Sequence, residues 1–401
     1  MDATRSRRST GAPAPPNTQP PWGDDLSSDV RQALTLDPAP ERRLHADVVV
    51  IGAGVAGLSA AITARQVGAD VLVLEAERDI GRGATGRNAG ILSAGVNMAL
   101  AGLPLESPLR EMWPATTREL LGLVEQATRP GALLQASLTG ALSLAERPSA
   151  ARYLEREAKA RTGLGLHAEM WTAQQVAEAG DGRLDARGMV AAMWLPDEGR
   201  IQPLTLLAHL ACEARALGVR LLGGARVREH MASAGRSGLS CWRLSLASGG
   251  TVEAGGLVEA VGPTAAPTAR IYAMAFPADL PDDFPLFWDS APFTYCDFRP
   301  GNARLGISGG RYGRAGAFGR DPHYHARLAT AARRWLPELA PVAPTHAWAV
   351  DLAVAPHMVP DARDLGARAP GRAIEGLGAL GVLPGVILGR QAGEEIARRL
   401  S

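Results

Sequence analysis

The sequence predicts an α/β fold in which a Rossmann-like domain with a parallel sheet is joined to a second domain built on an antiparallel sheet. A buried apolar strand, Val48 to Ile51, runs directly into a glycine-rich turn, Gly52 to Gly57, and then into a helix-forming segment that ends at about Val67. A further apolar strand, Val71 to Leu74, ends at Glu75. Two strand-like segments late in the chain, joined by a tight turn, indicate the antiparallel sheet.

The turn Gly52-Ala53-Gly54-Val55-Ala56-Gly57 fits G-x-G-x-x-G between a strand and a helix, the context that makes this pattern specific. Gly52 permits the tight turn, Gly54 lets the backbone approach a pyrophosphate, and Gly57 lets the helix pack closely on the strand. The helix N-terminus offers free N–H groups and a positive dipole to that anion. Glu75 follows Gly57 by 18 residues, where a carboxylate binds a ribose hydroxyl and repels a 2′-phosphate.

A second glycine-dense stretch, Gly81 to Gly90, follows where a plain NAD domain would continue into its next helix. It resembles the flavin-contacting loop of the D-amino-acid oxidase and glycine oxidase family, and Ala84-Thr85-Gly86-Arg87-Asn88-Ala89-Gly90 looks most like the γ-glutamylputrescine oxidoreductase branch. The resemblance implies a GR2-type Rossmann-like domain that binds FAD. Some relatives tether the flavin through a histidine in this loop or a late cysteine. Because the loop carries Arg87 and Asn88 and no cysteine follows Cys296, we expect noncovalent FAD.

Length and composition set the outer bounds. A chain of 401 residues that is 46% hydrophobic can bury a large core and form more than one domain. A net charge of +1 gives no electrostatic reason to expect nucleic acid or an acidic membrane as partner. No window approaches the apolar length of a membrane-spanning helix, and the three cysteines lie far apart, so we expect a cytoplasmic protein without disulfides or a metal site.

The N-terminal segment, Met1 to about Arg43, is rich in Pro, Ser, Thr and Arg and has no apolar period. It is therefore expected to be mostly disordered, apart from a short helix from about Asp25 to Leu34. The domain organisation expected for the whole chain is a disordered extension at 1–45, a discontinuous FAD-binding domain from 46–100, 197–265 and 370–401, and a substrate domain from 101–196 and 266–369.

Periodicity and turn signals predict the later elements. The expected helices are 113–126, 150–161, 204–217, 326–336 and 387–400, and the expected strands are 140–145, 191–195, 219–222, 226–228, 241–246, 257–262, 293–298 and 303–309. In the family, the strand around Val227 lies beside the adenine and the one that ends at Gly262 passes near the pyrophosphate. The last helix points its N-terminus at the pyrimidine edge of the flavin, where its dipole stabilises the reduced, negatively charged ring.

These arguments and the resemblance together assign a set of cofactor-binding residues. The set is Gly52, Gly54, Ala56, Gly57, Glu75, Ala76, Thr85, Arg87, Asn88, Ala89, Gly90, Val227, Gly262, Leu383 and Val386.

The chemistry that the resemblance implies is oxidation of a C–N bond. A neutral amine gives hydride to flavin N5, the imine product hydrolyses, and oxygen or another acceptor takes the electrons. Candidate catalytic residues are His346 and His357, which flank the return to the flavin, and Tyr295 and Asp297, which share one face of a strand by two-residue spacing. Each of these also has a plain structural reading, and the amine can lose its proton without a side-chain base if burial lowers its pKa.

The substrate and its class stay open at this point. Amino-acid-oxidising relatives carry an arginine after the tryptophan that Trp348 resembles or in the late glycine-rich loop, whereas this chain has Leu352 to Val354 and Leu380 to Val386 there. An amine without a carboxylate is therefore expected, and the alternative is an amino-acid oxidase of the glycine or D-amino-acid type in which Arg311 binds the carboxylate. A flavin-dependent hydroxylase and an FAD-binding protein without turnover are the other two classes. The single lysine, Lys159, lies on a helix expected to be exposed.

Overall fold

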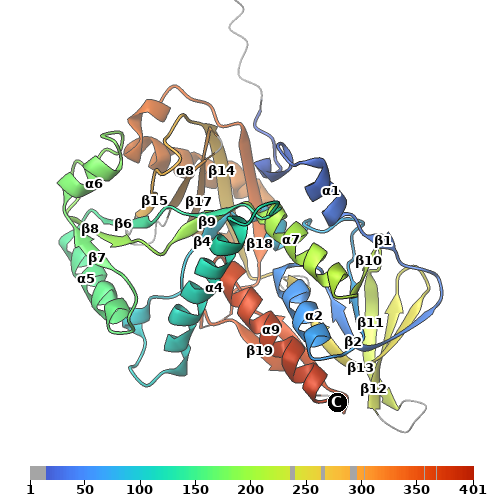
Figure 1. Ribbon diagram of the computed structural model, residues 1–401. Coiled ribbons are helices and arrows are strands. Elements are labelled where there is room, and N and C mark those ends of the chain that lie inside the picture. The colour runs from blue at the N-terminus through green and yellow to red at the C-terminus, as the bar shows by residue number, and fades with distance from the viewer. Residues whose placement is uncertain are drawn as a thin grey trace, which may run out of the picture.

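Two large β-sheets organise the chain (Figure 1). The computed structural model describes residues 15–234, 240–262, 267–289, 296–301, 303–355, 357–366 and 368–401. One sheet has nine strands and a parallel centre, and the other has eight strands and is almost entirely antiparallel. This arrangement confirms the α/β class and the antiparallel second sheet predicted from the sequence.

The nine-stranded sheet has the order β1-β10-β3-β2-β13-β12-β11, with β20 paired to β13 and β19 paired to β20. Its central strands run parallel and are buried on both faces, which is why Val48 to Val50 of β2 have no exposed surface. Segments far apart in sequence meet here: β1 (Asp37–Pro38), β2 (Arg43–Ile51), β3 (Val71–Leu74), β10 (Arg220–Gly223), β11 (Val227–Ala234), β12 (Ser240–Leu246), β13 (Thr251–Glu259), β19 (Asp361–Asp364) and β20 (Gly371–Glu375).

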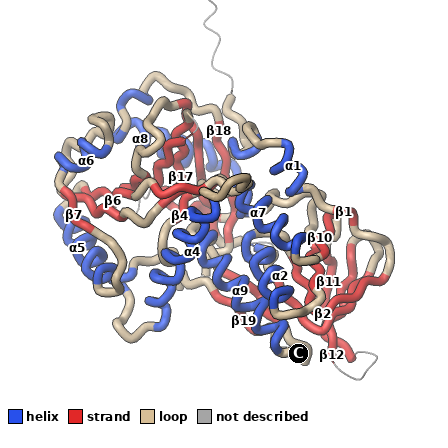
Figure 2. Tube along the Cα trace, in the orientation of Figure 1, coloured by secondary structure: helices blue, strands red, loops and turns tan. Residues whose placement is uncertain are grey.

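Three helices cover one face of this sheet, namely α2 (Val55–Gln66), α7 (Pro203–Ala216) and α9 (Val382–Arg398) (Figure 2). Helix α9 crosses α2 very closely, because Gly389 and Gly393 face the Ala56 and Ala60 carbonyls with no room for a side chain. Helix α9 begins five residues before the expected start at Ile387. Pro384 lies in its first turn, where the missing N–H is tolerated.

The eight-stranded sheet has the order β18-β14-β17-β16-β15-β6-β8-β7. Helix α8 (Asp321–Trp335) packs on one face through Leu328 and Trp335, and α5 (Pro148–Thr162) packs against β6 and β8. The strands are β6 (Ala141–Ala145), β7 (Glu169–Trp171), β8 (Ala191–Leu195), β14 (Ala269–Pro277), β15 (Leu286–Asp289), β16 (Cys296–Gly301), β17 (Arg304–Arg314) and β18 (His346–Leu352). The predicted strand at 293–298 is described only from Cys296 onwards.

Smaller elements join the two sheets. Strands β4 (Ile91–Leu92), β9 (Gly199–Ile201) and β5 (Ala136–Leu138) form a three-stranded sheet, and α4 (Met112–Ala127) packs against β5 and α9. Helix α6 (Ala173–Ala179) carries a capping box between Thr172 and Gln175. Among the described residues, none of the helices combines the length and the apolar character that crossing a membrane requires.

Residues 15–43 are packed against the rest of the protein, which differs from the mostly disordered extension expected from their composition. Helix α1 (Ser28–Leu34) is capped by Ser27, whose hydroxyl accepts a hydrogen bond from the Val30 amide, and Val30 and Leu34 are buried against α7. The partners that hold this segment lie far away in sequence, so composition alone gives no sign of them. Residues 1–14 lie outside the described part of the chain.

Candidate cofactor and substrate site

The glycine-rich turn has the geometry that its sequence predicts. Gly52 has φ of +99°, a left-handed conformation that favours glycine, and a Cβ there would also lie 2.5 Å from the Ala260 carbonyl oxygen. A Cβ on Gly57 would overlap the Gly52 carbonyl oxygen. The N-cap of α2 is Gly54, which has no side chain to occupy the free N–H groups of the first turn. No N-cap side chain therefore competes with an anion for the amides of this turn, of which Ala53 and Val55 donate to Glu75 and Thr85.

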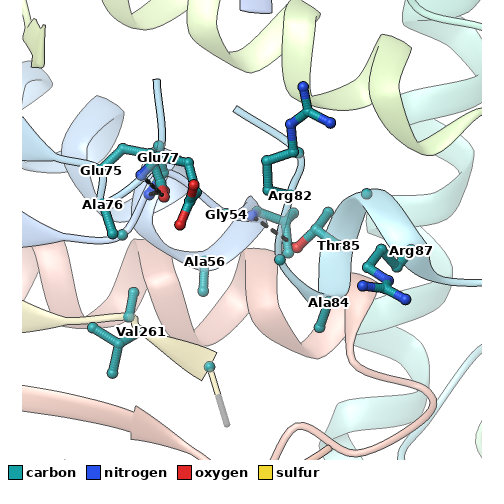
Figure 3. A pocket seen from close by; sticks show the side chains of 18 of the residues that line it. Gly54, Ala56, Glu75, Ala76, Glu77, Arg82, Ala84, Thr85, Arg87 and Val261 are labelled. Carbon is teal, nitrogen blue, oxygen red and sulfur yellow. Dashed lines mark hydrogen bonds between the residues drawn. The ribbon is translucent and has the colours of Figure 1, made fainter. Parts of the chain in front are cut away.

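Glu75 lies at the carboxyl end of β3, beside this turn. Its Oε2 accepts a hydrogen bond from the Ala53 amide at 2.9 Å, and its Oε1 accepts one from the Glu77 amide at 3.1 Å. The carboxylate lines a first cavity of about 520 Å³, together with Gly52, Gly54 and Ala76. Figure 3 shows Glu75 towards one end of this cavity and Arg87 towards the other, with Gly54 between them.

The loop from Gly81 to Gly90 closes the other end of the first cavity through the short helix α3 (Ala84–Arg87). The Thr85 hydroxyl accepts a hydrogen bond from the Val55 amide at 3.3 Å, which joins the loop to the start of α2. Asn88 donates its side-chain amide to the Thr85 carbonyl at 2.6 Å and accepts from the Gly90 amide at 2.6 Å. The loop is thus fixed by its own side chains.

Arg87 lines both the first cavity and a second one. Its Nη2 donates to the Ala349 carbonyl at 3.0 Å, whereas its buried Nε has no hydrogen-bond partner among the described residues. Burial, followed by the charge of Arg270, lowers the pKa of Arg87. Arg270, which the sequence reasoning missed, is held by Asp321 at 2.7 Å and Asp351 at 2.9 Å and also lines the first cavity. A donor left unsatisfied in a cavity wall suits a ligand that carries acceptor oxygens.

The second cavity, of about 110 Å³, lies between the loop Arg87–Ala89, strands β14 and β18, and the start of α9. Ile271, Val350 and Leu352 give it apolar walls. The glycine-rich turn before α9 is held by Asn97, which donates to the Leu377 carbonyl at 2.9 Å and accepts from the Leu380 amide at 3.0 Å. Apolar walls of this kind suit the two faces of a flat apolar ring.

A third cavity, of about 410 Å³, shares Ile271, Ala379 and Leu380 with the second. Its wall includes three aromatic residues and two charged residues of α5: Tyr153, Trp288, Tyr312, Glu157 and Arg161. The sequence reasoning did not single out any of these five residues. The sequence feature that could have indicated the Glu157–Arg161 ion pair is the i, i+4 spacing of these two residues on a predicted helix.

Arg161 is enclosed by two buried carboxylates. Its Nε donates to Glu157 Oε1 at 3.1 Å, and its Nη1 donates to Glu198 Oε1 at 3.1 Å. Glu157 also accepts from the Ala101 amide at 2.8 Å, and Glu198 accepts from the Ala94 amide at 3.0 Å. Burial raises the pKa of Glu198, whereas Arg161 acts in the opposite direction. The guanidinium charge of this cavity is thus already matched by carboxylates.

The predicted cofactor residues fall into three groups. Those that line the first or second cavity are Gly52, Gly54, Ala56, Glu75, Ala76, Thr85, Arg87, Asn88, Ala89, Val227 and Gly262. Gly57 and Gly90 shape the turns beside the cavities without lining them. Leu383 and Val386 line neither cavity, because both side chains are buried in the core that α9 shares with α2.

Of the four candidate catalytic residues, the structure describes the side chains of His346 and His357. His346 is buried, lies 2.9 Å from the Thr345 hydroxyl and 3.4 Å from Asp24, and lines neither cavity; burial lowers its pKa. His357 is exposed and also lines neither cavity. Tyr295 lies outside the described residues, as do the side chains of Asp297 in β16 and Arg311 in β17.

Comparison with solved structures finds the same fold in several proteins. The chain superposes on glycine oxidase from Geobacillus kaustophilus with a TM-score of 0.73 and 21% identity, over 89% of this chain and 95% of the other. L-proline dehydrogenase from P. horikoshii gives 0.72 and 17% over 90% and 94%, and iminodiacetate oxidase from Chelativorans sp. BNC1 gives 0.69 and 18% over 87% and 94%. At these identities the likeness concerns the fold alone.

Sequence comparison gives the family. No curated protein sequence matches the chain. The model of the family described as FAD dependent oxidoreductase, abbreviated DAO, matches residues 47–398, which include the glycine-rich turn, Glu75, the loop Gly81–Gly90 and α9. The match spans most of the chain and both large sheets, and this protein therefore belongs to the DAO family of FAD-dependent oxidoreductases.

Proposed function

We propose that this protein oxidises a C–N bond of a small amine that lacks an α-carboxylate, with noncovalently bound FAD. The observation that carries the proposal is the charge of the third cavity. Among the described side chains that line it, the only guanidinium is that of Arg161, which already binds Glu157 and Glu198. A substrate carboxylate in that cavity would find no free cation among the described side chains. Burying it unpaired would be costly, whereas a neutral amine meets no such penalty.

The residues of the first cavity suit the dinucleotide part of FAD. Glu75 is placed for a ribose hydroxyl, and the Gly54 and Ala56 backbone at the start of α2 is placed for the pyrophosphate. Arg87 lines both the first and the second cavity, and its Nε has no hydrogen-bond partner among the described residues. FAD, when bound, supplies the hydride acceptor, and the protein supplies position and electrostatics.

The apolar walls of the second cavity, which would hold the flavin ring, also suit keeping water away from the substrate carbon beside the ring. Leu352 and Leu380 line it at the two segments where amino-acid-oxidising relatives carry arginine. Exclusion of water by such walls favours the neutral form of an amine, because burial disfavours charge. The N-terminus of α9 lies at the same cavity through Gly381 and Val382, so its dipole stabilises negative charge there.

An amino acid is the second candidate substrate, and one observation favours it. Arg311 belongs to β17, the strand that also supplies Gly309 and Tyr312 to the third cavity. Arg311 is the residue to which the sequence assigns the carboxylate of an amino-acid substrate, and it adjoins Tyr312 in this strand. The similar structures are a glycine oxidase, an L-proline dehydrogenase and an iminodiacetate oxidase. The motif Ala84–Gly90, by contrast, supports the γ-glutamylputrescine oxidoreductase branch.

An anaerobic screen of amines and amino acids tests the proposal, with bleaching of the bound flavin as the signal. Amines without a carboxylate are expected to bleach it faster than glycine, sarcosine or simple D-amino acids. Faster bleaching by the amino acids contradicts the amine assignment. In that case Arg311→Met should abolish the amino-acid preference and assign the carboxylate site. Absence of bleaching by every compound contradicts amine oxidation itself and leaves FAD binding without turnover.

A further inference from the structure

The N-terminal segment Asn17–Asp25, called the strap below, lies outside the residues that match the family yet contacts the flavin-contacting loop directly. The Trp22 indole N–H donates to the Asn88 carbonyl at 2.9 Å. Trp348 donates its indole N–H to the Arg87 carbonyl, also at 2.9 Å. Two successive carbonyls of the loop are therefore each held by an indole, one from the matched region and one from the strap.

The two indoles also support each other. Their rings meet edge to face, with centroids 6.4 Å apart and an interplanar angle of 80°. This arrangement is favourable for aromatic pairs and fixes both N–H groups in direction. Displacement of Trp22 would therefore remove one hydrogen bond from the loop and loosen the residue that makes the other.

Both ends of the strap are anchored independently of the loop. Asn17 exchanges backbone hydrogen bonds with Thr345 and Ala347, each at 2.8 Å, at the start of β18. Asp24 lies 3.0 Å from Arg304 and 3.4 Å from His346. Gln202 donates its side-chain amide to the Trp22 carbonyl at 2.9 Å. These contacts fix the strap to β18, Arg304 and Gln202, and they position Trp22 against the loop.

The strap also closes a fourth cavity, of about 370 Å³, beside the second. Pro21, Trp22 and Asp25 form part of its wall, and Ala89 and Trp348 line both the fourth and the second cavities. Without the strap this side of the proposed flavin-ring site would open to solvent.

We propose that the strap forms one wall of the flavin site and that Trp22 is a positioning residue for the loop Arg87–Ala89. Trp22 holds the Asn88 carbonyl, and through Trp348 the Arg87 carbonyl, in the arrangement that receives the flavin. The strap shields the ring from water on this side. The inference rests on the proposed FAD site but not on the identity of the substrate.

Titration of the full-length apoprotein with FAD, followed by quenching of flavin fluorescence, tests the proposal. Trp22→Phe keeps an aromatic ring but loses the N–H donor, and it is expected to weaken FAD binding about fivefold, within the range for one lost hydrogen bond. Trp22→Ala is expected to weaken binding further and to make the residual fluorescence of bound flavin more sensitive to iodide. Trp171→Phe is the matched control. Trp171 belongs to β7, the outermost strand of its sheet, where it stacks on Trp194 of β8, and it lines none of the four cavities.

The outcomes separate this inference from the proposed function. If the wild-type apoprotein binds no FAD, the proposed site itself is wrong. If wild type and Trp171→Phe bind FAD alike, and Trp22→Phe and Trp22→Ala match them in affinity and in iodide sensitivity, the strap is not part of the flavin site. Urea unfolding of each apoprotein provides the check on folding. A loss of affinity in Trp22→Phe at an unchanged unfolding midpoint supports the positioning role.

Discussion

Replacement of Gly389 by alanine tests the close crossing of α9 on α2. An added Cβ would overlap the Ala56 carbonyl oxygen and lie 3.1 Å from both the Ala56 carbonyl carbon and the Ser59 Cβ. Because the obstacle is backbone in a neighbouring helix, it cannot rotate away, and α9 must move outwards. Overpacking of this kind costs about 1–3 kcal/mol. The higher helix propensity of alanine offsets about 1 kcal/mol of this cost. The free energy of unfolding should therefore fall by up to about 2 kcal/mol.

Gly122→Ala in α4 is the matched control, because nothing lies within 4 Å of the Cβ it would add. It should stabilise the protein by about 0.5–1 kcal/mol through helix propensity alone. The assay is urea unfolding of the two variants and wild type, followed by far-UV circular dichroism. Since α9 begins at the second cavity, Gly389→Ala should also weaken FAD binding, whereas Gly122→Ala should not. The packing argument is refuted if Gly389→Ala is as stable as Gly122→Ala.

Four further predictions concern the cofactor, pH and the electron acceptor. Denaturation in acid should release all of the flavin, and yellow colour that stays on the precipitated chain would show a covalent bond. Glu75→Gln, which keeps the shape but removes the charge, should weaken FAD binding about tenfold, as expected when a charged hydrogen-bond partner becomes neutral; unchanged affinity in the fluorescence titration would remove Glu75 from the site. Burial lowers the pKa of His209, so the unfolded chain takes up this proton more readily than the folded one. Stability should therefore fall as pH drops through about 6.5, the pKa of an unperturbed histidine, and urea midpoints at pH 7.5 and 5.5 should differ less in His209→Asn than in wild type. A lysine ammonium beside the flavin would stabilise the superoxide that forms when the reduced flavin reacts with oxygen. The single lysine of the chain, Lys159, is exposed on α5 and lines none of the four cavities, so reduced enzyme should react with oxygen more slowly than amine reduces the flavin. Equal rates in a stopped-flow experiment would mark a true oxidase.

Local features of the site could be predicted from the sequence. The strand, turn and helix from Val48 to Gln66 depend on neighbouring residues and on apolar periodicity, and the structure has them where expected. The same holds for Glu75 at the end of β3, because the strand and the acidic residue are adjacent in the chain. The start of α9 was predicted too late. The glycine-rich stretch before it was read as continuing through Val386, whereas Pro384 fits within the first turn.

Features that depend on distant partners could not be predicted. Arg161 meets Glu198 across 37 residues, and Arg270 meets Asp351 across 81. Nothing in the local sequence distinguishes these arginines from the many on the surface. Trp22 lies in a stretch whose proline and polar content argues against a core, and its partner Asn88 is 66 residues away. Such contacts follow from the assembled fold and not from periodicity.

The second cavity is complete only when β20 has paired with β13 and α9 has packed on α2. Strand β20 pairs with β13, more than 100 residues earlier, and α9 contributes the last wall of the second cavity. A chain without β20 and α9 would therefore have the turn Gly52–Gly57 but an incomplete flavin-ring site. Parallel pairing across such separations is slow compared with local structure. The flavin-ring site should thus form later in folding than the dinucleotide turn, and a chain truncated before Gly371 should fail to hold the ring.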